Sequence, residues 1–138
     1  MMANAPIALR ASPEDFLEIM NIERFSDRSG FSSHLSVGSG RFSCSRHPFY
    51  FDDLDGFTKG IAKAYERVGG KARLAHRYET DSIEIEVLRT GKVLVSGFIV
   101  EHGPSHQELR FTFGCDQTFL PELLRSLRQV AGELERKS

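Results

Sequence analysis

Alternating apolar and polar residues predict strands in the second half of the chain. The alternation is clearest over residues 71–79 and 82–88, where every second position is apolar or aromatic apart from one inward-facing histidine. Successive side chains on a strand point to opposite faces, so one face of each strand should be buried and the other exposed. Short turns at residues 80–81 and 90–91 favour hairpins, and hence antiparallel neighbours.

Residues 92–101 form a strand with apolar side chains on both faces. Three such side chains fall on each face: Val93, Val95 and Ile99 on one, and Leu94, Phe98 and Val100 on the other. This pattern is typical of a central strand that is covered on both sides, but it also suits a strand that exposes an apolar patch. The sequence leaves both interpretations open.

Three earlier strands and one later strand bring the expected number to about seven. Their ranges are 16–23, 32–37, 41–45 and 109–113. Gly38 and Gly40 mark a hairpin turn between the second and the third of these strands. The first twelve residues have no sustained pattern, so we expect them to be flexible.

Two segments have the three-and-four spacing of amphipathic helices. The first covers residues 52–68, with Asp52 as its expected N-cap and Gly69–Gly70 at its end. The second begins near Phe119, after an N-cap at Thr118, because Pro121 is acceptable only in the first turn of a helix. Its apolar stripe consists of Leu120, Leu123, Leu124, Leu127, Val130, Ala131 and Leu134.

Together these elements predict one α+β domain over residues 13–138, after a flexible segment at residues 1–12. The expected architecture has two layers: a twisted, mostly antiparallel meander sheet of about seven strands, with two helices packed on one face. A chain of 138 residues is long enough to bury an ordinary core.

Composition excludes several classes of partner. Lys and Arg number 18 against 19 Asp and Glu, so no net positive charge attracts nucleic acid. No apolar run approaches the ~20 residues of a membrane span, and residues 1–10 do not resemble a signal peptide. Cys44 and Cys115 belong to no metal-binding or redox motif. We therefore expect a cytoplasmic protein that binds neither nucleic acid nor membrane.

The candidate catalytic and metal-binding residues do not assemble into a recognisable set. His102 and His106 lie in a loop with Gly and Pro, where a solvated loop is favoured over a metal site. His76 is expected to face the core as a hydrogen-bonded histidine. Cys115 precedes a helix start but lacks an activating base, and the adjacent Asp116 is better explained as an Asx turn. We expect no catalytic, metal-binding or cofactor-binding residues.

Charged side chains are expected on the outward face of the later strands, where Glu84 and Glu86 would lie across from Arg73 and Arg77. A solvated sheet face explains them, since opposite charges on neighbouring strands contribute ~0.2–1 kcal/mol per pair. If apolar side chains share that face, an apolar centre with a charged rim would suit a protein interface. The candidate protein-binding residues are Arg73, Arg77, Glu84, Glu86, Leu94, Phe98 and Val100.

Two sequence motifs resemble the WapI-type immunity family and related small bacterial proteins of unknown function. One is the helix opening Asp52-Asp-Leu-Asp-Gly-Phe57, and the other is the strand, turn and helix start Phe111-Thr-Phe-Gly-Cys-Asp-Gln-Thr-Phe-Leu120. The matching positions are structural: Leu54, Phe57, Asp116, Gln117, Phe119 and Leu120. The resemblance covers about residues 14–130 and implies a non-enzymatic cytoplasmic protein of a bacterium that binds and neutralises a cognate toxin of a polymorphic or contact-dependent system.

Two other interpretations remain open. One is a domain that binds a small molecule or acts as an enzyme, with a pocket beside the helix starts at Asp52 or Thr118. Its polar groups would be Arg73, His76 and Tyr78, and a helix N-terminus could hold an anion. The other is a homodimer formed through the apolar patch.

Overall fold

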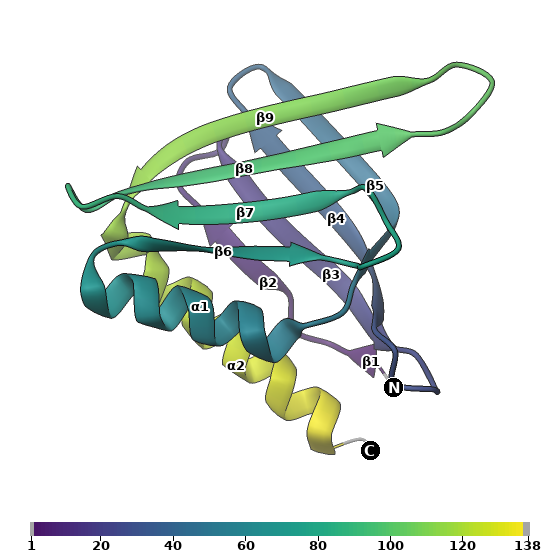
Figure 1. Ribbon diagram of the computed structural model, residues 1–138, viewed down its shortest axis with the longest axis horizontal. Helices are drawn as coiled ribbons and strands as arrows, with labels where there is room; N and C mark the ends of the chain where they lie inside the picture. The colour runs from purple at the N-terminus through teal and green to yellow at the C-terminus, as the bar shows by residue number, and fades with distance from the viewer. Residues whose placement is uncertain (1, 137–138) are drawn as a thin grey trace.

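The computed structural model describes residues 2–136 and has an α+β fold, as the sequence predicts (Figure 1). Within these residues, nine strands form two antiparallel sheets. The first sheet contains β1 (Met2–Ala3), β2 (Ile7–Arg10), β3 (Phe16–Arg24), β4 (Phe31–Ser39) and β5 (Phe42–Phe51), and the second contains β6 (Gly70–Ala75), β7 (Ser82–Val87), β8 (Lys92–Glu101) and β9 (Gln107–Asp116). The helices are α1 (Leu54–Arg67) and α2 (Leu120–Arg136), and a 3-10 turn at Gln117–Phe119 precedes α2.

The strands divide into two sheets, and α1 lies between β5 of the first and β6 of the second along the chain. Figure 1 shows the strands of the first sheet crossing behind those of the second. The apolar positions of both sheets belong to one buried cluster together with the stripes of α1 and α2. Alternation along a strand identifies its buried face but does not say which sheet it joins. The sequence therefore predicted the fold class and the antiparallel pairing of the strands, whereas their division into two sheets is seen only in the structure.

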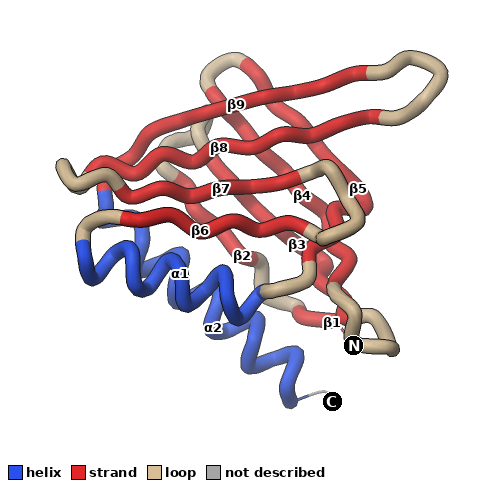
Figure 2. The backbone as a smooth tube through the Cα atoms, viewed as in Figure 1, coloured by secondary structure: helices blue, strands red, loops and turns tan. Residues whose placement is uncertain are grey.

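The two helices lie on the same side of the molecule, along the outer strands of the two sheets (Figure 2). α1 packs beside β6, α2 packs beside β2 and β1, and the helices also contact each other. Leu123, Leu127 and Val130 of α2 are fully buried. Each such side chain contributes roughly 1.5–3 kcal/mol by burial, as an upper estimate.

The first residues of the described chain are part of the sheet, which corrects the expectation of a flexible segment; Met1 lies outside the described residues. β1 and β2 both pair with β3. Ile7 is fully buried, and the Ala8 N–H donates to Ser126 Oγ of α2 at 3.2 Å. A four-residue strand gives too short an alternation to be recognised without its partner strand.

β6 ends at Ala75, so the expected strand over residues 71–79 is too long. The chain turns at residues 76–79, where the Glu79 N–H donates to the His76 carbonyl at 2.9 Å. His76 is half-buried and its Nδ1 accepts the Tyr78 N–H, whereas 83% of Tyr78 is exposed. The expected inward position of Tyr78 is therefore wrong, because the alternation continues into residues that do not pair.

The helix ends also differ from expectation by one or two residues. Asp53, not Asp52, is the N-cap of α1, and its Oδ1 accepts the Gly56 N–H at 2.9 Å. Val68, not a glycine, takes the left-handed conformation at the other end, with φ of 51°. Before α2, Asp116 Oδ1 accepts the Thr118 N–H at 2.8 Å, which confirms the Asx turn and replaces Thr118 as the cap.

Candidate protein-binding face on the second sheet

The outward face of the second sheet carries two rows of charged side chains. Antiparallel register places Arg73 opposite Glu84 and Lys71 opposite Glu86. The side chains of both glutamates are half-buried, whereas those of both cations are exposed. Because the neighbouring positions along β6 and β7 are buried in the core, all four charges belong to the outer face of the sheet.

An apolar and aromatic strip lies beside these rows on β8. Leu94 is opposite Glu86, and Phe98 is opposite Ser82 on one side and Arg110 on the other. The Arg110 guanidinium carbon lies 4.1 Å from the centre of the Phe98 ring. A cation over an aromatic face contributes ~0.5–1 kcal/mol at an exposed site. Leu94 and Phe98 are half-buried, so this strip is neither fully covered nor fully exposed.

The structure brings five of the seven predicted residues together on this face, whereas Arg77 lies elsewhere and Val100 is buried. Arg77 lies in the turn after β6, where its backbone N–H and its Nε donate to Asp52 Oδ2 at 3.1 and 3.4 Å. Val100 is only 3% exposed, so its side chain has little surface to offer. Lys71 and Arg110 also belong to the outer face, but they are not among the residues predicted from the sequence. Alternation over residues 107–113 could have indicated Arg110, because Leu109, Phe111 and Phe113 occupy the intervening positions.

A charged cluster joins this sheet to the first one. Arg46 of β5 donates from Nε to Asp81 Oδ2 and from Nη1 to Glu101 Oε2, both at 2.8 Å. Asp81 is buried, and its other oxygen accepts the Val100 N–H at 2.9 Å. These residues are distant along the chain, so no sequence pattern could have revealed the cluster. It fixes the end of β8 relative to β5.

Four of the five histidines form two close pairs. His102 and His106 have ring centres 5.5 Å apart in the loop before β9, and His106 Nε2 lies 2.9 Å from Glu108 Oε2. His34 and His47, for which the sequence suggests no companions, have ring centres 5.2 Å apart. Across residues 2–136, no group of three or more His, Cys, Asp or Glu side chains is arranged to hold a metal ion.

The surroundings of Cys115 disfavour its thiolate form. Burial, reinforced by the negative charge of Asp116, raises the pKa of its thiol to about 11. The thiolate is the nucleophilic form, and it is scarce near neutral pH at such a pKa. Cys44, which is also a free thiol, has a pKa raised mainly by burial.

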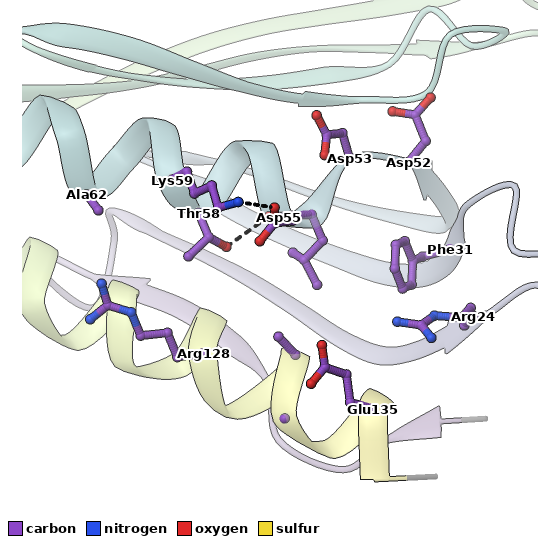
Figure 3. Close-up of a pocket in the computed structure, with 13 residues that line it drawn as sticks. Arg24, Phe31, Asp52, Asp53, Asp55, Thr58, Lys59, Ala62, Arg128 and Glu135 are labelled. Atoms are coloured by element: carbon purple, nitrogen blue, oxygen red, sulfur yellow. Dashed lines mark hydrogen bonds and ion pairs between the residues drawn. The ribbon is translucent and has the colours of Figure 1, made fainter. Parts of the chain in front are cut away.

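A hollow of about 590 Å³ lies where the start of α1 approaches the end of α2 (Figure 3). Its lining includes Asp53, Asp55 and Lys59, and the last two form an ion pair at 2.8 Å. The helix N-terminus here is already occupied, because Asp53 accepts a backbone N–H of the first turn. A second hollow lies beside the turn at Thr118. Neither hollow is lined by the predicted pocket residues, which are Arg73, His76 and Tyr78.

Comparison with known protein families gives a match over most of the chain. The model of the family described as "Immunity protein WapI-like family" matches residues 9–134, which is most of the chain. No curated protein and no solved structure matches. Neither helix within residues 2–136 has the length and apolar character of a membrane span. The matched range includes both motifs, and the chain therefore belongs to the WapI-like immunity protein family.

Proposed function

We propose that this protein neutralises a cognate toxin by binding it through the outer face of the second sheet, without catalysing a reaction. Membership of an immunity protein family is the observation that carries the proposal. An immunity protein that acts by occlusion needs a complementary surface rather than a catalytic set.

The chemistry of the outer face suits a protein partner. Phe98 and Leu94 supply apolar area in the centre, and aromatic side chains with arginines are enriched among residues that dominate binding energy. The charged rows on β6 and β7 flank that centre, where they can select a partner by complementary charge and reject others. A near-neutral total charge, with 18 basic and 19 acidic residues, favours a protein over nucleic acid as the partner.

Co-purification followed by a growth assay tests this function. Tagged wild type and Phe98→Asp are used to capture proteins from the source cells, after circular dichroism shows that the variant is folded. We expect the wild type to retain a protein that stops growth when expressed alone and is harmless when co-expressed with the wild type. Phe98→Asp should fail both to retain this protein and to restore growth. A retained partner that is not toxic, or full rescue by Phe98→Asp, would contradict the proposal.

A further inference from the structure

β9 is an edge strand of the second sheet that offers free backbone groups to a partner. Within the described residues it pairs only with β8, and β8 pairs with β7 on its other side. In Figure 1 the β8–β9 hairpin extends beyond the rest of the sheet. Natural edge strands of this length are usually covered or interrupted, since unpaired N–H and C=O groups invite another strand.

Three hydrogen bonds determine which backbone groups of β9 face outward. The Lys92 carbonyl accepts from Leu88 at 2.8 Å, and the Val100 N–H donates to Asp81, which directly precedes β7, at 2.9 Å. Both of these backbone groups point toward β7. The N–H and C=O groups of the even-numbered residues of β8 therefore point away from β9. Even-numbered residues of β9 pair with them and must face the free edge. The Thr112 carbonyl supports this assignment, because it points away from β8 and accepts a hydrogen bond from Ser39 Oγ at 3.2 Å.

Ser39 therefore occupies the edge at Thr112 and leaves the first half of β9 uncovered. The free groups in this half are the N–H and C=O of Glu108 and Arg110. Their side chains are exposed on the outer face of the sheet and have opposite charges two positions apart. Like charges at these positions would repel a second copy of the strand, whereas an opposite pair is complementary to itself in antiparallel register.

That register also places suitable side chains at its centre. With Glu108 opposite Arg110 of a second copy, Leu109 lies on the two-fold axis opposite its own counterpart. Leu109 is half-buried on the inner side of the sheet and packs against the core. The paired segment is then residues 107–111, which stops one residue short of the contact between Thr112 and Ser39.

We propose that two copies of this chain form a symmetric dimer by antiparallel pairing of β9 over residues 107–111. Glu108 and Arg110 of the two copies exchange backbone hydrogen bonds and form two equivalent ion pairs. The second sheet of each copy thereby becomes half of a continuous eight-stranded sheet. This interface is small compared with the ~800 Å² per partner of stable complexes, so the dimer should be reversible and dependent on concentration. It does not depend on the proposed binding of a toxin.

Charge reversal tests the pairing in the purified full chain. Sedimentation velocity is measured for wild type, Glu108→Arg, Arg110→Glu and the double variant E108R/R110E at increasing concentration, with circular dichroism as the folding control. The wild type should approach twice the 15.5 kDa chain mass as its concentration rises. Each single variant should dimerise roughly tenfold more weakly, because both ion pairs become repulsive, and the double variant should recover the dimer.

Amide exchange provides a second measurement that is independent of the substitutions. The N–H groups of Glu108 and Arg110 should become protected as the wild-type concentration rises, whereas those of Leu109 and Phe111 should be protected throughout by β8. A wild type that stays monomeric up to about 1 mM would overturn the proposal. A dimer that survives both single reversals, or a folded double variant that remains monomeric, would overturn it as well.

Discussion

Two glycines make room for aromatic rings on neighbouring strands. Gly38 is opposite Phe16 in the first sheet, and Gly97 is opposite Phe111 in the second. A Cβ built on Gly97 would lie 2.4 Å from the Phe111 ring, and one on Gly38 would lie 2.4 Å from the Phe16 ring. Each ring therefore lies across the strand in space that only glycine leaves open. Glycine is needed at these positions for close approach rather than for a special backbone conformation.

We expect Gly97→Ala to lower the free energy of unfolding by roughly 1–3 kcal/mol, because the new methyl group overlaps the Phe111 ring. Gly132→Ala is the matched control, since apart from its chain neighbours and the backbone of α2 itself no atom lies within 4 Å of the Cβ that it would add. That change should raise stability by about 0.5–1 kcal/mol through helix propensity. Urea unfolding of both variants measures the difference, and equal effects would show that the close approach at Gly97 is unimportant.

Asp52 provides a pH-dependent contribution to stability. Its burial acts to raise its pKa, but the hydrogen bonds and charge of Arg77 prevail and hold the pKa below its ordinary value. When the pKa of a carboxyl group is lower in the folded than in the unfolded state, its ionised form stabilises the fold at pH values above the ordinary pKa. This stabilisation is lost as the pH falls through the pKa of the folded state.

We therefore expect Asp52→Asn to lower stability by about 1 kcal/mol at pH 7, because a charged acceptor is lost. Asparagine preserves the shape of the side chain and can still accept the Arg77 N–H. The difference from wild type should shrink as pH falls from about 5 to 2, where Asp52 itself becomes protonated. Thermal unfolding across this range measures it. If the stabilities of wild type and Asp52→Asn differ by the same amount at every pH down to 2, the ionised carboxylate does not have this role.

Single strands and helices were predicted correctly where the spacing of apolar residues within the element itself identifies it. The expected range 92–101 matches β8, whose apolar side chains fall on both faces throughout, and 82–88 differs from β7 by one residue, because β7 alternates along its full length. The predicted range of β6 was too long, because the alternation continues through residues 76–79 although they form a turn. β2 was not predicted, because its pattern is too short. The two-sheet arrangement and the Arg46–Asp81 contact depend on distant pairings, which a local pattern does not contain.

The end of α1 contains an unfavourable backbone conformation. Val68 has φ of 51° and ψ of 57°, which is left-handed and costs roughly 1–2 kcal/mol for a residue with a Cβ. We expect Val68→Gly to raise the free energy of unfolding by about 1 kcal/mol, because glycine adopts this conformation without the clash. Val68→Ala retains a Cβ and should give no such gain. Chemical denaturation of both variants measures this, and a glycine variant less stable than the alanine variant would contradict it.

In the molecule as a whole, the outer face of the second sheet is the surface that we propose for binding the toxin. The predicted binding residues on β6, β7 and β8 do lie together there, but Arg110 of β9 completes the group and Val100 is buried. Sequence patterns identified the face through alternation within strands. They could not reveal how Arg110 covers Phe98, because that contact joins two strands.

Calorimetric titration of the purified toxin with this chain measures whether the two proteins bind and how tightly. We expect a stoichiometric complex with a dissociation constant of about 10 nM or tighter, within the range of protein complexes of ordinary size. Phe98→Asp should weaken binding by roughly 100-fold or more, because a charge would enter the apolar centre of the interface. Tyr78→Asp is the control, since Tyr78 is 83% exposed and lies in the turn after β6. Absence of wild-type binding, or unchanged affinity of folded Phe98→Asp, would show that the toxin does not bind at the outer face of the second sheet.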